Sequence, residues 1–233
     1  MERLYPTLGQ KSGIIACAAL FLALGFSHAL AQDALTWSGT LSHTPSSTTL
    51  ESWNWGTDTL SIGQYTDSTS NMLGALTISA ASVSGGTLSI NYGTVSLLGG
   101  QLKTNGHVYV AQAGATASFL ISGSGLGVVA TNLNFGYSSA ATGTVSIRDG
   151  GSLTATGSAL LGFSGNATML VSGSTSKAII GTAMHLGYTR SASGTVQVLD
   201  GGTLSHSGYT YLAFSGSGKL LVSGAGSNAI IKG

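Results

Sequence analysis

The histidines and aspartates are the side chains of this sequence best suited to catalysis or metal binding. Beyond residue 31 the histidines are His43, His107, His185 and His206. The spacing of His185 and His206 allows them to lie on adjacent coils of a repeat. A zinc site needs at least three protein ligands, and this part of the chain has no cysteine and few carboxylates. We therefore predict ordinary solvated histidines, with no metal and no cofactor.

Asp149 and Asp200 occupy equivalent positions 51 residues apart. Carboxylates of this kind serve polysaccharide lyases and hydrolases, so a carbohydrate-active enzyme is the alternative to a non-catalytic protein. A residue that recurs once per repeat in front of Gly-Gly is more typical of a turn, where aspartate bonds the backbone. His206 with Asp200 and one of the many serines gives no triad, because no nucleophile elbow or ordered spacing accompanies them. The sequence predicts no catalytic residue and no enzymatic activity.

Two glycine-rich stretches resemble nucleotide-binding loops only in part. In the segment 216–219 (Gly-Ser-Gly-Lys), Ala213 stands where the first glycine of a phosphate loop belongs, and Leu220 replaces the hydroxyl residue that would hold magnesium. The segment 123–127 (Gly-Ser-Gly-Leu-Gly) lacks the strand–turn–helix context of a dinucleotide fingerprint. We interpret both stretches as turns between short strands.

Aromatic side chains are the remaining candidates for a binding surface. Near the start these are Trp37, Trp53 and Trp55, which we expect to cap the first coils, sugar stacking being the other interpretation. Farther along, we expect a modest contact stripe on one side of the molecule from Arg148, Tyr137, Tyr188 and Tyr209. Nothing in these residues specifies the ligand.

The elements that must position these residues come from an internal repeat. The stretch 143–153 (GTVSIRDGGSL) returns as 194–204 (GTVQVLDGGTL), 51 residues later. The stretches 135–137, 161–163 and 186–188 (Phe/Leu-Gly-Tyr/Phe) divide this unit into two halves, each of about 25 residues. Looser copies extend upstream to 93–102, with traces at 60–63 and 76–79.

Each half repeat contains three short segments in which apolar and polar residues alternate, for example 133–136, 144–148 and 152–156. Val145 and Ile147 then face a core while Ser146 faces water. Glycine pairs at 150–151 and 201–202 permit the positive φ of sharp corners. A three-strand coil cannot bury its own apolar side, so coils must stack. We predict an all-β fold, a single-stranded parallel β-helix (β-solenoid) with about 25 residues per coil and a 51-residue double repeat.

Residues 1–31 have the composition of a signal peptide, with Arg3 and Lys11 before an apolar run and Ala29-Leu-Ala31 at the expected cleavage site. The apolar run is shorter than the ~20 residues of a membrane span, which leaves an uncleaved anchor as the lesser alternative. Cys17, the only cysteine, would be removed with this segment. The whole chain has eight basic and seven acidic side chains, and without residues 1–31 it would have six of each. This neutral balance does not favour nucleic-acid binding.

The repeat, with its Leu-Gly-Tyr, Gly-Thr-Val and Gly-Gly-Thr-Leu elements, resembles the repeats of bacterial autotransporter (type V secretion) passenger domains and of some PEP-CTERM exported proteins. The tryptophans at 37, 53 and 55 resemble the opening of such passengers. The resemblance implies a right-handed β-helix exported through the inner membrane and displayed at the cell surface or outside the cell, or held in the periplasm where no translocator is available. Its partners would be host-surface, matrix or glycan ligands.

The expected organisation is a signal peptide at 1–31, a tryptophan-containing cap with irregular coils at 32–75, and the repeat region at 76–233. This region stops within a repeat and lacks the family's β-barrel, so we expect a C-terminal truncation and a translocator that is encoded elsewhere or lost. The predicted function is a structural or adhesive passenger module. A non-functional fragment of a longer autotransporter is a further alternative.

Overall fold

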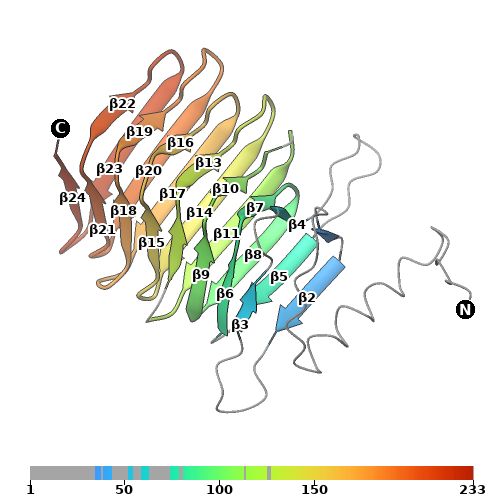
Figure 1. Ribbon diagram of the computed structural model, residues 1–233. Coiled ribbons are helices and arrows are strands. Elements are labelled where there is room, and N and C mark those ends of the chain that lie inside the picture. Colours follow the sequence, from blue (N-terminus) through green and yellow to red (C-terminus); the bar gives the residue numbers. More distant parts are fainter. Residues whose placement is uncertain are drawn as a thin grey trace, which may run out of the picture. The chain divides into compact units, whose positions relative to one another are not determined.

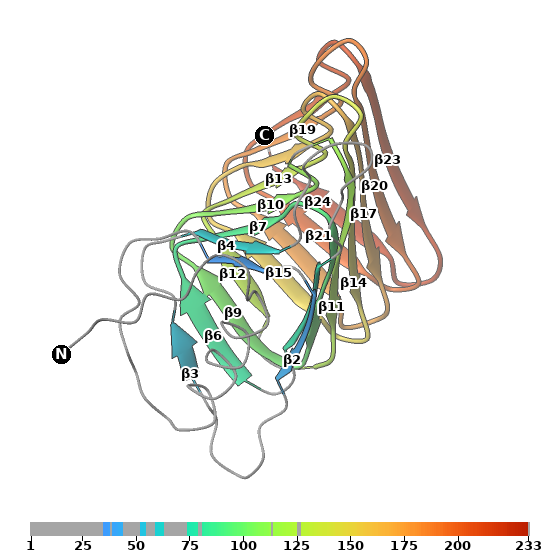
Figure 2. The same ribbon diagram turned by 90° about the vertical axis from the view of Figure 1, so that its right-hand side faces the viewer.

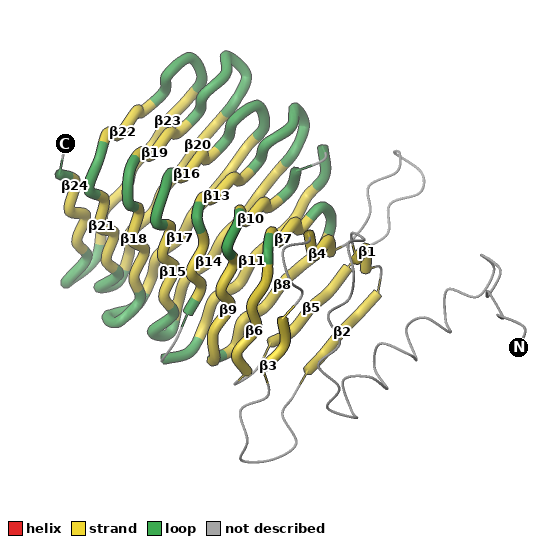
Figure 3. Tube along the Cα trace, in the orientation of Figure 1, coloured by secondary structure: helices red, strands yellow, loops and turns green. Residues whose placement is uncertain are grey.

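The computed structural model describes residues 35–37, 39–43, 52–54, 59–62, 74–78, 81–112, 114–124 and 127–232 (Figure 1). Side chains are described at 77–78 and, within these ranges, from 83 onward. The expected signal peptide, its cleavage after Ala31 and Cys17 lie outside the described residues. Within them, Figure 3 shows only strands and loops, with no helix.

In the described part of the chain, twenty-four strands form three parallel sheets of eight strands each, and every coil gives one strand to each sheet (Figure 2). Sheet A contains β1 (Leu35–Trp37), β4 (Thr59–Ile62), β7 (Thr87–Ile90), β10 (His107–Val110), β13 (Asn132–Phe135), β16 (Ala159–Leu161), β19 (Ala183–Leu186) and β22 (Tyr209–Leu212). Sheet B contains β2 (Gly39–His43), β5 (Gly74–Ile78), β8 (Gly93–Leu98), β11 (Thr116–Ser122), β14 (Thr142–Arg148), β17 (Asn166–Ser172), β20 (Ser193–Leu199) and β23 (Ser217–Ser223). Sheet C contains β3 (Ser52–Asn54), β6 (Ala81–Gly85), β9 (Gly100–Thr104), β12 (Val128–Ala130), β15 (Ser152–Ala155), β18 (Lys177–Ile180), β21 (Thr203–His206) and β24 (Asn228–Ile231). The predicted parallel β-solenoid is confirmed.

Strand register explains the double repeat. Aligned positions along sheet A include Phe135, Leu161, Leu186 and Leu212, so the chain advances by nearly the same length from one coil to the next. In sheet B the aligned residues are Val145, Met169, Val196 and Leu220, with steps of 24, 27 and 24. Two successive steps in sheet B make the 51-residue unit found in the sequence. The repeat therefore consists of two coils whose corners alternate in length.

The core follows from the alternation of side chains along each strand. In β14, Gly143, Val145 and Ile147 are buried while the residues between them are partly exposed. Val145 is aligned with Phe119 of the coil before and Met169 of the coil after, and all three are buried. Stacking thus closes one apolar core from Ile78 to Leu204. The predicted inward and outward faces of 144–148 are confirmed.

The corner between sheets B and C differs in detail from the expected glycine turn. Positive φ falls on Asp149 (53°) and Gly150 (86°), not on the second glycine. Asp200 and Gly201 repeat this pattern. Gly151 is needed for another reason, because a Cβ there would overlap the carbonyl group of Ile121 in the coil before. Aspartate suits the first position since its short polar side chain tolerates the left-handed region.

Candidate functional site

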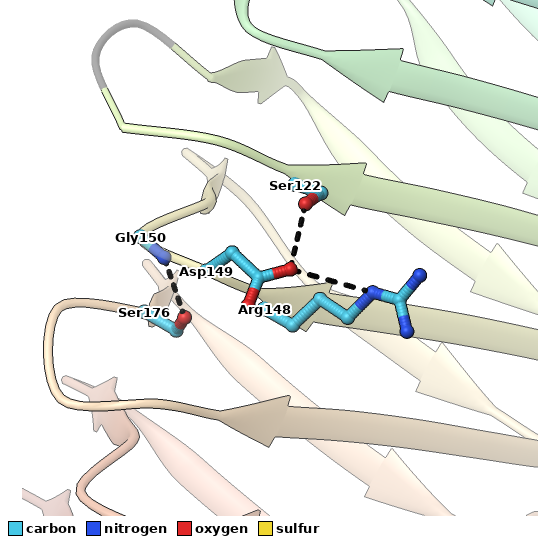
Figure 4. A network of polar contacts seen from close by, with 5 residues as sticks. All are labelled: Ser122, Arg148, Asp149, Gly150 and Ser176. Carbon is cyan, nitrogen blue, oxygen red and sulfur yellow. Dashed lines mark hydrogen bonds and ion pairs between the residues drawn. The ribbon is translucent and has the colours of Figure 1, made fainter.

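The repeated aspartates belong to the turns between sheets B and C. The Asp149 carboxylate accepts a hydrogen bond of 2.9 Å from Ser122 Oγ and lies 3.7 Å from Arg148 Nε (Figure 4). The Gly150 amide donates to Ser176 Oγ of the next coil at 3.1 Å. Turn residues of three coils are therefore linked. Because both side chains of the ion pair are more than half exposed, solvent screens their attraction.

Asp200 repeats the arrangement two coils farther along. Its carboxylate accepts a hydrogen bond of 3.3 Å from Ser172 Oγ, and the Gly201 amide donates to Ser227 Oγ at 3.1 Å. The expectation that these aspartates form turns is confirmed, although the partner of each carboxylate is a serine hydroxyl of the preceding coil.

The four histidines are not brought together where the structure describes them. His185 and His206 belong to one coil, not to adjacent ones, and His185 lies on the outer side of β19. His206 points inward from β21. Its Nδ1 lies 3.2 Å from the backbone carbonyl oxygen of Ile180, and its Nε2 lies 3.0 Å from the backbone carbonyl oxygen of Tyr209. His107 Nδ1 lies 3.1 Å from Asn132 Nδ2. The side chain of His43 is outside the described part. Among the described residues no group of three His, Cys, Asp or Glu side chains is placed to hold a metal ion.

The turn predicted at 216–219 is only partly correct, because residues 217–219 belong to β23 and Gly216 alone lies at a corner. Gly216 precedes β23, and a Cβ there would overlap backbone oxygens of the coil before. Lys219 lies within β23, aligned with Thr195 of β20. Gly123 has a φ of 97° at the corner after β11, and a Cβ on Gly127 would overlap the Ser152 carbonyl group. Coil stacking accounts for these glycines.

The most regular feature of the surface is a column of aromatic rings between sheets A and B, which we call the aromatic ladder. Its members are Tyr137, Phe163, Tyr188 and Phe214, one from each of four successive coils. Successive ring centroids are 4.9, 5.1 and 4.9 Å apart, and their planes are inclined by 11°, 15° and 6°. These are stacked pairs at the distances that aromatic side chains prefer.

Left-handed residues at the end of sheet A place the ladder. Each ring follows Gly136, Gly162, Gly187 or Ala213, whose φ angles lie between 61° and 71°. The strand therefore turns sharply after its last inward residue. A Cβ on Gly187 would overlap the carbonyl oxygen of Ser217 in the next coil, so glycine is required there by the close approach as well as by φ.

A second set of rings, the flanking rings, lies beside the ladder on sheet A: Tyr109, His185 and Tyr211. His185 stacks on Tyr211 with centroids 4.8 Å apart and planes inclined by 12°. Edge-to-face contacts join the two sets, at 5.9 Å for Tyr109 and Tyr137 and at 5.5 Å for His185 and Tyr188. The flanking rings are interrupted, because Asn134 and Leu160 occupy the two rungs between Tyr109 and His185. The ladder and the flanking rings together form two adjoining rows at the edge of sheet A, the second with this gap.

Burial sets the protonation of this surface. It lowers the pKa of the His185 imidazole, and His185 Nδ1 is buried without a hydrogen-bond partner. Burial also raises the pKa of the Tyr109 hydroxyl, and the neighbouring Tyr137 raises it further. Both shifts favour the neutral form of the side chain concerned, the imidazole of His185 and the phenol of Tyr109.

The predicted contact stripe is only partly correct. Tyr137 and Tyr188 lie in one column, but Arg148 ends β14, whereas Tyr137 lies before that strand begins. Tyr209 is 71% exposed and makes no ring contact among the described residues. Phe163 and Phe214, which complete the ladder, were not predicted. The repeat signalled Phe163 through its Leu-Gly-Phe spacing, and the 51-residue offset from Phe163 leads to Phe214.

Of the predicted tryptophan cap, Trp37 lies in β1 and Trp53 in β3, at the first positions of sheets A and C. Their side chains, and Trp55 as a whole, lie outside the described residues.

Comparison with protein-family models, curated proteins and solved structures finds no match to this chain. The described residues contain no helix that is long and apolar enough to cross a membrane. The class of the protein is therefore defined by its fold, a three-sheet parallel β-solenoid.

Proposed function

We propose that this chain is a non-catalytic, surface-displayed module of the autotransporter-passenger type, which presents an outer face of a β-solenoid to ligands. The observation that carries the proposal is the aromatic ladder between sheets A and B, with the flanking rings beside it. Exposed apolar residues gathered in a contiguous patch mark interaction sites on folded proteins. Tyr137, Tyr211 and Phe214 are 36%, 42% and 57% exposed within the two rows.

The solenoid supports this proposal through its geometry. Four successive coils repeat the same kind of surface group, so weak contacts add along one face by avidity. The resemblance of the 51-residue repeat to passenger repeats supports the route, with a signal peptide for the inner membrane and a separate translocator for the outer one. Matrix or glycan ligands on host surfaces are the partners that such a route would reach.

Surface display and adhesion test this proposal together. The full chain, carrying an epitope tag in the exposed turn 174–175, is produced in a bacterium with an outer membrane, with and without a co-expressed translocator. We expect the tag to be accessible to antibody and protease on intact cells with the translocator, and those cells to adhere to immobilised matrix or glycan surfaces. Retention of the folded chain inside the cell under both conditions, or display without adhesion, would contradict the proposal.

A further inference from the structure

The aromatic ladder has a two-coil period of its own. Tyrosine and phenylalanine alternate along it, because each 51-residue unit supplies one Tyr (Tyr137, Tyr188) and one Phe (Phe163, Phe214). A phenolic hydroxyl therefore recurs at every second rung. With strands ~4.8 Å apart in a sheet, the chemical repeat of this surface is about 9.6 Å.

The rings of the ladder do not cover one another completely. Their centroid separations of 4.9 to 5.1 Å exceed the ~3.5–4.0 Å at which two layers of carbon atoms make optimal contact. Nearly parallel rings at this separation are offset sideways, which is the arrangement that aromatic pairs prefer. The ladder is accessible to a ligand, since Tyr137 is 36% and Phe214 57% exposed, and Phe163 and Tyr188 are partly exposed.

The chemistry of the surface selects the ligand. The ladder and the flanking rings include no lysine, arginine or carboxylate side chain, and burial lowers the pKa of His185, which favours its neutral form. They offer apolar ring surface and, at intervals, a hydroxyl that donates and accepts hydrogen bonds. An uncharged sugar has the matching groups, with an apolar C–H side for a ring and hydroxyls for a tyrosine.

We propose that the aromatic ladder binds an extended, uncharged β-1,4-linked glycan whose chain runs parallel to the solenoid axis. In such a glycan each sugar is turned over relative to the one before, so equivalent groups recur every two sugars, at a distance close to that of two rungs. The alternating tyrosines would meet the same side of the glycan each time. This inference rests on the proposed function and names its ligand class.

Calorimetric titration of the full chain tests the inference with hexasaccharides of equal length. The probes are cellohexaose and chitohexaose, which are β-1,4-linked, and maltohexaose, which is α-1,4-linked and coils. We expect one or both β-1,4 probes to bind at least tenfold more tightly than maltohexaose. Because the ladder has four rings, affinity should rise from the disaccharide to the tetrasaccharide and change little beyond it.

Two matched variants locate the site. Phe163→Leu removes a central ring of the ladder and keeps an apolar side chain, and we expect it to weaken binding at least tenfold. Tyr209→Leu removes an exposed ring of β22 that belongs neither to the ladder nor to the flanking rings, and we expect binding within twofold of the original. Circular dichroism and the melting temperature of each variant establish that the solenoid is intact.

Three results would overturn the inference: no binding of either β-1,4 probe, equal binding of the α-1,4 probe, or equal losses in the two variants. Self-association that Phe163→Leu abolishes, without glycan binding, would instead assign the ladder to a second copy of the chain. Cells that display the chain and adhere through a ligand other than a β-1,4 glycan would refute this inference and leave the proposed function standing. Binding of cellohexaose by a chain that never reaches the cell surface would support this inference and refute the proposed function.

Discussion

Val145→Asp is the sharpest test of the stacked core. Val145 is fully buried between Phe119 and Met169 of the neighbouring coils. Removing a buried aliphatic side chain loses about 1.5–3 kcal/mol of transfer free energy. Leaving a buried polar group without a partner costs about 1–3 kcal/mol more. We therefore expect the free energy of unfolding, measured by urea denaturation followed by circular dichroism, to fall by about 3–5 kcal/mol.

The matched control is Ser146→Asp, one residue farther along the same strand. Ser146 is partly exposed on the outer side of β14, aligned with Leu120 and Leu170. A carboxylate there stays hydrated, so we expect a loss of less than about 1 kcal/mol. Equal losses for the two substitutions would show that the assigned inward and outward faces are wrong.

The pH dependence of Val145→Asp supplies a second criterion. Burial raises the pKa of the introduced carboxyl in the folded state above its ordinary value of about 3.9. Below about pH 4 both the folded and unfolded states are protonated, and the penalty is smallest. As the pH rises above the unfolded-state pKa, the penalty should grow by about 1.4 kcal/mol per unit until the folded-state pKa is passed. A penalty that is independent of pH would refute burial of the carboxyl.

Three further predictions concern the corners and the aromatic surface. Gly187→Ala should lower the free energy of unfolding, measured by urea denaturation, by about 2–4 kcal/mol, because its Cβ would overlap the backbone oxygen of Ser217. The control is Gly226→Ala, which has a similar positive φ but only ordinary contacts for its Cβ and should cost about 1–2 kcal/mol. Equal losses for the two variants would exclude the overlap. Asp149→Ala should cost about 1–2 kcal/mol in urea denaturation, and Asp149→Asn less than half of that, since asparagine also tolerates a left-handed turn. Burial lowers the pKa of His185 in the folded state, so protonation of this histidine favours the unfolded state. The melting temperature should therefore fall as the pH drops below about 6.5 and level off below the folded-state pKa. His185→Leu should remove this part of the pH dependence, and a variant whose pH profile is unchanged would contradict the prediction.

The fold was predictable because the same local signals recur in every coil. Alternation at 144–148 fixes which side chains face inward, and Asp-Gly-Gly marks a corner. The same alternation also determines the place of His206, since it lies two residues after the buried Leu204 and must point the same way. His206 belongs to the interior for that reason, and the prediction of a solvated histidine there is wrong.

The aromatic ladder was harder to predict because no single coil contains it. In one coil, Leu-Gly-Tyr indicates a strand end followed by an exposed tyrosine. The stack exists only when residues one coil apart in the sequence are brought to neighbouring rungs. At Phe214 the preceding glycine is replaced by Ala213, which keeps the left-handed φ of 61° but removes the sequence signal. Stacking geometry, more than the intrinsic preference of one residue, maintains the turn.

The alternation of shorter and longer steps in sheet B, 24 and 27, limits how this protein can change in length. Loss or duplication of one 51-residue unit replaces each coil by one of the same kind and preserves the strand register and the order of the corners. Loss of a single coil would keep the register, because steps of 24 and of 27 residues both align buried residues, but it would place two corners of the same length together. Recombination between copies that match 51 residues apart therefore lengthens or shortens the solenoid in steps of two rungs, about 9.6 Å. Each such step would add or remove one Tyr–Phe pair, so the order of rings along the ladder would be inherited unchanged.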